Sequence, residues 1–597
     1  MAIKKHFRRG LAFFILLGPV LSPGVFSAGP GPAGQRPVQG QDRASRDDRA
    51  GRREQAGLPE IQSYISSAWD SLTRSMTSCR SITDPKASTP PVIYLPADFA
   101  IPPELEPVTR ECHAQIARLP QVIHRLGEID VEGLDAHALL YLPHPYVVPG
   151  GMFNEMYGWD SYFIIRGLVE SGHLEMARGM VENFFFEISH YGALLNANRG
   201  YMLTRSQPPF LTSMIMAVYD AENAKGHDDR EWLETAYPYA VKDHDLWVHE
   251  PHLAGASGLS RYFDFGLGPV AEEDPAYYRR AAAYFILHPG EAAGSLSTTA
   301  PGEHPPDPIG LRFSLSLCSK SAGSENAGSD NAGGEHAGAP GAANCDHLED
   351  AGLTADFYKG DRSVRESGFD ITFRYGPYAA GTHHYADVGL NCLLYKAETD
   401  LERMSTLLSK SAEAGKWRQR ASGRRSAINR YFWNAHKGEF FDYDFTRAER
   451  SSYEYATTFY PLWIGLATRE QAEAVDRNFP YFDRPGGLLT SLKETGGQWD
   501  APYGWAPLQL IAAEGLRRYG FAQDANRLSA EFLTTVLLNF RRDGTIREKY
   551  NVVTRSSETH VQAGYTQNVV GFGWTNGVFL VLLHSLPADW IGRIPLQ

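Results

Sequence analysis

Long stretches in which apolar residues recur every three or four positions dominate this chain of 597 residues. One helix face is formed by Leu174, Ala177, Val181, Phe184 and Ile188. The same period recurs over residues 401–431, 461–478, 507–519 and 528–540, and Gly, Pro and aromatic residues fill the intervening segments. Short stretches between the helices, such as residues 440–444, predict hairpins. Because no run of buried parallel strands alternates with these helices, the pattern predicts an all-α toroid rather than an α/β barrel.

The first 57 residues differ in composition from the rest of the chain. Four basic residues precede an apolar run from Leu11 to Leu21, and small residues follow at Ser27 and Ala28. This order is typical of a secretory signal peptide, and the run is too short to span a membrane comfortably. A buried amphipathic helix is the alternative. We expect a signal peptide at 1–28, a disordered linker at 29–57, and a secreted, periplasmic protein with no membrane association after cleavage.

Residues 58–597 contain one low-complexity insert, at about residues 319–345. We therefore expect a single catalytic domain over 58–597 with this insert as a surface loop. The five cysteines (Cys79, Cys112, Cys318, Cys345 and Cys392) have no CxxC spacing, which indicates structural roles rather than a zinc site or a redox pair. Cys318 and Cys345 bracket the insert, and a disulfide between them is one alternative in an oxidising compartment.

The charge balance excludes one class of partner. Lys and Arg total 57 against 70 Asp and Glu, a formal charge of -13, which repels a phosphate backbone. We expect no nucleic-acid partner. The 11 Trp, 30 Tyr and 30 Phe are explained mostly by core packing, yet they also suit a cleft in which rings stack on a flat, hydroxylated ligand.

Polar and aromatic clusters lie at the expected helix starts, where a rigid scaffold aims side chains into a cleft. They are residues 149–160, 196–199 with 205–209, 365–370, 498–507, and 547–550 with 571–577. Asp160 has a structural alternative as the cap of a helix beginning at Ser161, and Arg205 as an ion-paired residue. Asp370 and Glu548 lie among aromatic and glycine residues, where burial raises a carboxyl pKa towards that of a general acid.

Two of these clusters resemble the signatures of the α,α-trehalase family of glycoside hydrolases. Residues 149–162 match Pro-Gly-Gly-Arg-Phe-x-Glu-x-Tyr-x-Trp-Asp-Ser-Tyr except at Met152, and residues 498–507 match Gln-Trp-Asp-x-Pro-x-Gly-Trp-x-Pro. The resemblance covers about residues 147–583, and residues 154–158, 259–262 and 365–368 are similar to the fungal neutral-trehalase branch. The calcium-loop pattern of that branch, Asp-x-Asp-x-Asn, is absent from the amino-terminal region, so we expect no calcium regulation.

The resemblance implies an (α/α)6 toroid that hydrolyses α,α-trehalose to two glucose molecules with inversion at the anomeric carbon. Asp370 matches the family's general acid and Glu548 its general base, and an inverting pair should lie roughly 6.5 to 9.5 Å apart. The positions that match sugar-binding positions of the family are Phe153, Trp159, Asp160, Asn196, Arg205, Ser206, Gln207, Glu272 and Gly368. Trp499, Trp505 and Trp574 are candidates for pocket walls, with core packing as the alternative.

The chain departs from the family pattern at four positions. Met152 replaces the signature arginine, Val270 a second arginine of one branch, Gly564 a glutamate, and Gly389 an acid. Each lost hydrogen bond to a charged group costs roughly 1.5 to 3 kcal/mol of binding. Two alternatives therefore stay open: a hydrolase of another small α-glucoside, and a weakly active disaccharide-binding homologue.

The sequence gives no indication of a cofactor. No set of His, Cys and carboxylate residues has ligand spacing, so we expect no cofactor and no metal. We interpret the pair His383 and His384 as polar residues of a surface or loop. The expected partner is the disaccharide trehalose, and the expected oligomeric state is a monomer.

Overall fold

The computed structural model describes residues 57–83, 89–298, 310–318 and 345–594. The chain divides into two units, Met1–Arg52 and Arg53–Gln597, and the elements below all belong to the second. The expected signal peptide, nearly all of the expected linker and residues 319–344 of the insert lie outside the described residues.

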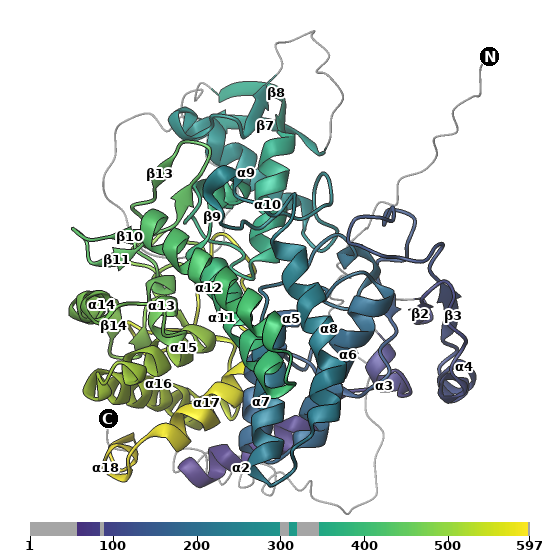
Figure 1. The fold of residues 1–597 in the computed structure, drawn as a ribbon. Coiled ribbons are helices and arrows are strands. Elements are labelled where there is room, and N and C mark those ends of the chain that lie inside the picture. The colour runs from purple at the N-terminus through teal and green to yellow at the C-terminus, as the bar shows by residue number, and fades with distance from the viewer. Residues whose placement is uncertain (1–56, 84–88, 299–309, 319–344, 595–597) are drawn as a thin grey trace, which may run out of the picture. The chain divides into compact units, whose positions relative to one another are not determined.

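Six helices contact one another in a closed cycle (Figure 1). In order around the ring they are α5 (Gly158–Glu170), α7 (Leu211–Ala224), α11 (Val388–Leu407), α13 (Tyr460–Trp463), α15 (Ala506–Arg518) and α17 (Gly573–Ser585). The short α13 continues the 3-10 turn η7 (Ala456–Phe459). Helix α17 is buried from Gly573 to Leu583, as expected for a sequence that is apolar on all faces.

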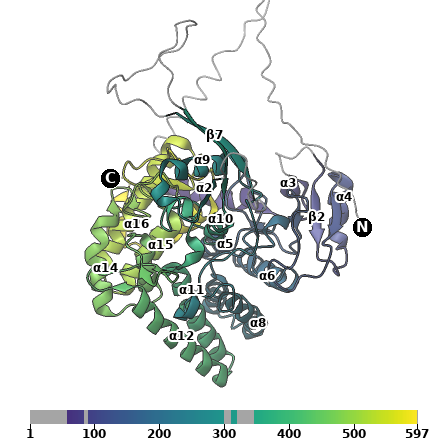
Figure 2. The ribbon, with the colours of Figure 1, turned by 90° about the horizontal axis from the view of Figure 1, so that it is seen from above.

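A second set of helices packs outside this ring. It consists of α2 (Leu58–Leu72), α6 (Leu174–His190), α8 (Arg230–Trp247), α12 (Ser411–Tyr431), α14 (Arg469–Phe482) and α16 (Ala522–Asp543). Helix α6 contacts α5 and α7, α8 contacts α7 and α11, α12 contacts α11, and α16 contacts α15 and α17. Figure 2 shows α6, α8, α12 and α14 outside α5, α11 and α15. The predicted all-α, (α/α)6 toroid is confirmed.

Two glycines bring α5 and α17 into backbone contact where the ring closes. A Cβ added at Gly577 would lie 2.2 Å from the carbonyl oxygen of Phe163, and one added at Gly167 would lie 2.3 Å from the Cα of Gly577. Neither position has room for a side chain. This pair of helices therefore packs at a separation that only glycine allows.

The helices compare with the predicted segments as follows. Helices α6, α15 and α16 cover the segments predicted at 174–188, 507–519 and 528–540. The segment 401–431 is divided between α11 and α12, with a left-handed residue at Ser409 (φ 59°) in the turn. Residues at helical spacing are buried on both helices, on α12 at Ala414, Trp417, Ala421 and Ile428, so the turn between them is not revealed by periodicity alone. Segment 461–478 is divided in the same way between α13 and α14.

Residues 440–444, a stretch in which the sequence predicts hairpins, contribute one strand to each of two hairpins. Strand β11 (Glu439–Phe440) pairs with β10 (Trp433–Asn434), whereas β12 (Tyr443–Asp444) pairs with β13 (Glu449–Arg450) and β9 (Tyr385–Ala386). The segment therefore links two different sheets. The other antiparallel pairs are β1 (Thr73–Arg74) with β5 (Tyr146–Val147), β14 (Asp483–Arg484) with β15 (Gly487–Leu488), and β16 (Tyr503–Trp505) with β17 (Lys549–Asn551).

Two three-stranded sheets and several short helices complete the described part. The parallel sheet has the order β3 (Gln115–Arg118), β2 (Val92–Leu95), β4 (Leu139–Leu140), and the antiparallel one β6 (Leu296–Thr298), β8 (Cys345–Leu353), β7 (Arg312–Cys318). The other helices are α3 (Cys79–Ile82), α4 (Glu106–Glu111), α9 (Pro275–Leu287), α10 (Ala355–Glu366) and α18 (Ala588–Ile591). The remaining 3-10 turns are η1 (Pro103–Leu105), η2 (Gly200–Met202), η3 (Gly255–Ser257), η4 (Pro289–Glu291), η5 (Pro377–Ala379) and η6 (Thr382–His384).

A disulfide joins Cys79 at the start of α3 to Cys112 at the end of α4, across a sequence separation of 33 residues. Cys392 is a buried free thiol on α11. The backbone register of β7 and β8 pairs Cys318 with Cys345, and the disulfide considered between them stays a prediction. Within the described ranges, no helix is both long enough and apolar enough to cross a membrane.

Candidate active site

A cavity of roughly 540 Å³ is lined by residues at and near the amino-terminal ends of the inner helices α5, α7 and α17. Its volume lies within the range of small-molecule sites. Most residues that the sequence singled out line it together: Phe153, Trp159, Asp160, Asn196, Arg205, Gln207, Glu272, Gly368, Asp370 and Glu548. These residues come from positions 153 to 548, so the ring and its loops assemble the site from distant segments.

Ser206 is the predicted sugar-binding residue that does not line this cavity. It is fully buried, and its hydroxyl donates to the Leu194 carbonyl at 2.6 Å. Its backbone N–H donates to Oε1 of the buried Glu366 at 3.2 Å. Ser206 therefore holds the loop between its neighbours Arg205 and Gln207, both of which reach the cavity.

The start of α5 places two of the cavity residues. The helix begins at Gly158, so Asp160 lies within its first turn and does not cap a helix at Ser161; that interpretation is corrected. The backbone N–H of Trp159 donates to Oε1 of Gln207 at 2.8 Å, and that of Gly158 donates to the Asn196 carbonyl at 3.1 Å. Loop side chains and carbonyls thus satisfy the free donors of this helix end.

Asp370 follows helix α10 after a turn that requires glycine. Gly368 has a φ of +74°, and a Cβ there would lie 2.7 Å from the ring of Trp159. Burial raises the pKa of the Asp370 carboxyl to about 7, against the opposing charges of Arg365 and Arg205. A carboxyl with this pKa is protonated in a large fraction of molecules near neutral pH, as a proton donor must be.

Glu548 is placed by the antiparallel pair of β16 and β17. The register sets Lys549 opposite Trp505, and the Glu548 backbone N–H donates to the Val569 carbonyl at 3.1 Å. The ammonium of Lys549 donates to Glu548 Oε2 at 2.9 Å, and the hydroxyl of Tyr565 donates to Oε1 at 3.0 Å. The carboxylate is buried and held at both oxygens, and a positive charge lies directly beside it.

Asp160 adds a third carboxyl group to the cavity. Burial, followed by the charges of Glu548 and Asp370, raises the pKa of Asp160 well above its usual value. Three carboxyl groups in one enclosed site cannot all ionise without cost, because each charge disfavours the others. The cavity thus has the electrostatics of an acid–base site.

Two arginines on one side of the cavity are paired with carboxylates. Arg205 forms a short hydrogen bond to Glu272 and lies 3.7 Å from Asp264, while Arg365 contacts Glu273 at 3.1 Å. Burial alone would raise the pKa of Glu272, but the charges of Arg205 and Arg365 outweigh it and the pKa is lowered. These groups can offer several charged donors and acceptors to ligand hydroxyls. The ion-paired alternative for Arg205 is therefore compatible with a place in the cavity.

Tryptophan side chains form one wall. Trp159, Trp499 and Trp574 line the cavity, with ring centroids 5.7 Å apart between Trp159 and Trp499 and 5.6 Å apart between Trp159 and Trp574. Trp505 stacks on Trp499 at 3.8 Å, with its indole N–H donating to the Gln498 carbonyl. Trp505 is fully buried and does not line the cavity, so for this residue the core-packing alternative is correct.

The four departures from the family pattern lie in different surroundings. Met152 lines the cavity, whereas Val270, Gly389 and Gly564 do not. A Cβ at Gly564 would lie 2.8 Å from the side chain of Gln498, at a φ of +114°. A glutamate is therefore strained at this position.

Sequence reasoning missed several polar residues of the site. Arg365 and Tyr565 line the cavity. Lys549 does not line it, but its ammonium donates a hydrogen bond to Glu548 Oε2. Arg365 and Lys549 lie inside the clusters singled out in the sequence, but no pattern separates them from residues on a solvated face. Tyr157 also lines the cavity, and its ring lies 5.6 Å from that of Phe153.

Comparisons with known proteins show the family to which this chain is similar. The sequence profile of the trehalase family matches residues 102–277 and 324–587. The cytosolic neutral trehalase of Saccharomyces cerevisiae is 33% identical over 570 residues, covering 86% of this chain and 70% of the yeast protein. That of Emericella nidulans is 35% identical over 486 residues, covering 74% of this chain and 58% of the relative. The solved structure of neutral trehalase Nth1 from Saccharomyces cerevisiae matches with a TM-score of 0.69 and 29% identity, covering 91% of this chain and 96% of that one.

Proposed function

The chain belongs to the trehalase family, and from this premise we propose that it hydrolyses α,α-trehalose to two glucose molecules with inversion at the attacked anomeric carbon. The observation that carries the proposal is the contrast between two carboxyl groups of one cavity. The pKa of Asp370 is raised to about 7, whereas Glu548 lies against the ammonium of Lys549. Carboxyl groups in such different environments can take the acid and base roles.

In this mechanism Asp370 protonates the glycosidic oxygen as the bond to the leaving glucose breaks. Glu548 removes a proton from a water molecule that attacks the anomeric carbon from the opposite face of the sugar ring. The hydrogen bonds from Lys549 and Tyr565 fix the orientation of the Glu548 carboxylate. Neither step uses a metal or a cofactor.

The remaining cavity residues are proposed to bind sugar. Asp160, Asn196, Arg205, Gln207 and Glu272 offer polar groups to the hydroxyls. Phe153 and Trp159 offer flat apolar faces to the rings, and Gly368 leaves room beside Trp159. The catalytic domain in this proposal comprises residues 58–597 and acts as a monomer.

One observation supports a second candidate, hydrolysis of another small α-glucoside. Met152 lines the cavity at the position where the family signature has arginine, so an apolar and flexible surface replaces a fixed set of charged donors. The third possibility is a disaccharide-binding protein without turnover. It is disfavoured because binding alone does not require both Asp370 and Glu548.

We also propose export to the periplasm. The basic, apolar and small residues of positions 1–28 have the order of a signal peptide. The disulfide between Cys79 and Cys112 is of a kind that forms and persists in oxidising compartments. The curated relatives above are named cytosolic, so export would distinguish this chain from them.

A glucose-release assay on trehalose, followed by a panel of α-glucosides, tests the proposal. Trehalose should give the highest kcat/KM, and proton NMR at early times should show one β-glucose from the attacked ring. Turnover of a different α-glucoside alone would favour the second candidate. Calorimetric binding of trehalose without release of glucose would favour the third, and α-glucose alone from both halves would exclude inversion.

A further inference from the structure

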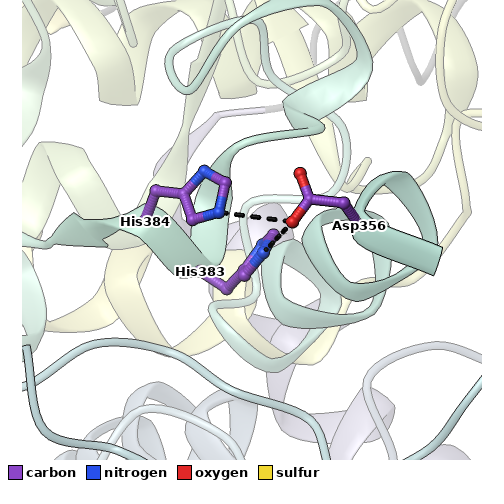
Figure 3. A group of neighbouring side chains, drawn as sticks. All are labelled: Asp356, His383 and His384. Atoms are coloured by element: carbon purple, nitrogen blue, oxygen red, sulfur yellow. Dashed lines mark hydrogen bonds and ion pairs between the residues drawn. The ribbon is translucent and has the colours of Figure 1, made fainter. Parts of the chain in front are cut away.

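A group of three potential metal ligands lies outside the cavity, between α10 and the 3-10 turn η6 (Figure 3). Asp356 is in the first turn of α10, and His383 and His384 end η6. One carboxylate oxygen and one nitrogen of each imidazole lie within 4.8 Å of one another. Sequence spacing did not reveal the group because Asp356 precedes His383 by 27 residues. His383 is also not a surface residue, since its side chain is 7% exposed.

Both separations from the Asp356 carboxylate oxygen fit one ion. Asp356 Oδ1 lies 3.0 Å from Nε2 of His383 and 3.3 Å from Nε2 of His384. Two ligands at 2.0 to 2.1 Å from a tetrahedral zinc ion are about 3.3 Å apart. These two separations therefore require only small side-chain shifts for a metal ion to replace the protons that now lie between the Asp356 carboxylate and the two imidazoles.

The backbone on both sides of the group is held in place. Thr354 caps α10 through a hydrogen bond from the Phe357 N–H at 3.1 Å, which fixes the turn that carries Asp356. In η6, the His384 N–H donates to the Gly381 carbonyl at 2.8 Å, and Arg261 donates to the His383 carbonyl at 2.9 Å. Such preorganisation lowers the entropy lost when the ligands close on an ion.

The group is also open to solvent. The exposed fractions of 48% for Asp356 and 32% for His384 leave the group open to solvent for entry of an ion.

We propose that Asp356, His383 and His384 bind one divalent transition-metal ion of the zinc class, with water completing the coordination. Two imidazoles and one carboxylate favour Zn²⁺, Co²⁺ or Ni²⁺ over the oxygen-preferring Ca²⁺ and Mg²⁺. The ion joins the start of α10 to η6, two segments that already contact each other.

This site stabilises the fold and takes no part in the hydrolysis. None of its three residues lines the cavity. Asp356 and Arg365, which does line it, are nine residues apart on α10, or about 14 Å along the helix axis. An ion that binds the folded chain and not the unfolded chain raises Tm. The proposal stands independently of the proposed trehalose hydrolysis, because its readout is metal binding.

The test uses the full mature chain, produced without a histidine tag and freed of metal with a chelator. Calorimetric titration with Zn²⁺ should show one ion per chain, and Co²⁺ should give the visible absorption of a tetrahedral site. Asp356→Asn and His383→Gln should each weaken binding at least tenfold and remove the metal-dependent rise in Tm. The matched control His436→Gln, at an exposed histidine, should bind as the unaltered chain does.

Chelation should leave kcat and KM on trehalose unchanged. Absence of binding by Zn²⁺, Co²⁺ and Ni²⁺, or binding that is equal in the unaltered chain and His383→Gln, would overturn the proposal. Circular dichroism of each variant establishes that lost binding is not lost folding, and Asp356→Asn, altered at a partly exposed side chain, provides a second variant if His383→Gln does not fold. A chain that binds one zinc ion but does not cleave trehalose would refute the proposed function and retain the metal site.

Discussion

Asp370 sets the pH range in which the proposed acid can work. Its pKa is raised to about 7, chiefly by burial, so the carboxyl is protonated below pH 7 and loses its proton as the pH rises through that value. We expect kcat/KM on trehalose to fall above an apparent pKa of about 7. Steady-state kinetics from pH 5 to 9 measure this fall in kcat/KM above neutral pH. It should persist in Asp243→Asn, since Asp243 has a similar raised pKa but lies outside the cavity.

The two proposed reacting carboxyl groups can be removed without changing side-chain volume. We expect Asp370→Asn and Glu548→Gln each to lower kcat by roughly 10²- to 10⁴-fold, because each loses the group that transfers a proton. Matched controls are Asp243→Asn and Glu439→Gln, which alter buried carboxyl groups with a pKa of about 7 outside the cavity. Near-normal turnover by either active-site variant, with contamination excluded, would reject the assignment.

Met152 lines the cavity at the position where the family signature has arginine. Methionine offers a flexible apolar surface, whereas an arginine would offer fixed donors to hydroxyl groups. For a trehalase, Met152→Arg should lower KM more than it changes kcat, because the side chain contacts sugar and not the bond that breaks. Restoring the family's glutamate at Gly564 is not a useful second step, because a Cβ there meets Gln498 at a φ of +114°. Lower kcat/KM on trehalose in Met152→Arg would instead favour a different α-glucoside.

The sequence predicted which residues line the cavity better than it predicted the residues that form hydrogen bonds and ion pairs with them. Asp370 and Glu548 were found through their glycine and aromatic neighbours and through the family resemblance, and both line the cavity. Lys549 and Arg365 were not, because a cation that pairs with a buried carboxylate has the same sequence pattern as one on a solvated helix face. Ser206 was assigned to the sugar through the family resemblance, whereas its hydroxyl donates to the Leu194 carbonyl.

At the scale of elements, helix periodicity located most of the ring and turn geometry did not. The division between α11 and α12 falls in a run whose apolar period is unbroken, and only the left-handed Ser409 marks it. The contact between α5 and α17 likewise depends on Gly167 and Gly577, which the sequence alone would assign to flexible or weak helix positions. Close helix packing, and not flexibility, requires these glycines.

That packing gives a prediction about Gly577. Because Gly577 has no side chain, α17 can approach α5 closely, and Gly577→Ala would force the two helices apart. We expect this substitution to lower the free energy of unfolding by roughly 1 to 3 kcal/mol, as overpacking of a core does. The matched control is Gly415→Ala on α12, where no atom lies within 4 Å of the added Cβ. This control should be neutral or stabilising by about 0.4 to 1 kcal/mol. Urea unfolding of both variants measures the difference, and equal stabilities would contradict the account of the ring closure.

At the scale of the whole molecule, the cycle of inner helices explains why distant clusters meet. The inner helices α5, α7, α11, α13 and α15 are each followed in sequence by an outer helix that returns the chain, so the starts of α5, α7 and α17 come to one end of the ring with their loops. Side chains at these starts then line one cavity, although they lie hundreds of residues apart in sequence. The helix pattern favoured an all-α toroid, and the family resemblance supplied its (α/α)6 form, because amphipathic helices of these lengths also suit other all-α packings.

The disulfide between Cys79 and Cys112 links the stability of the chain to its compartment. Closing a loop of this length removes freedom from the unfolded chain and stabilises the fold by roughly 2 to 4 kcal/mol. Protein exported to an oxidising compartment should therefore melt at a higher temperature than the same protein treated with dithiothreitol. The double variant Cys79→Ser with Cys112→Ser should have the lower Tm and show no response to the reductant, which separates this disulfide from any other. If Cys79 and Cys112 of exported protein are both alkylated without reduction, and Tm is unchanged by dithiothreitol, neither the disulfide nor its support for export holds.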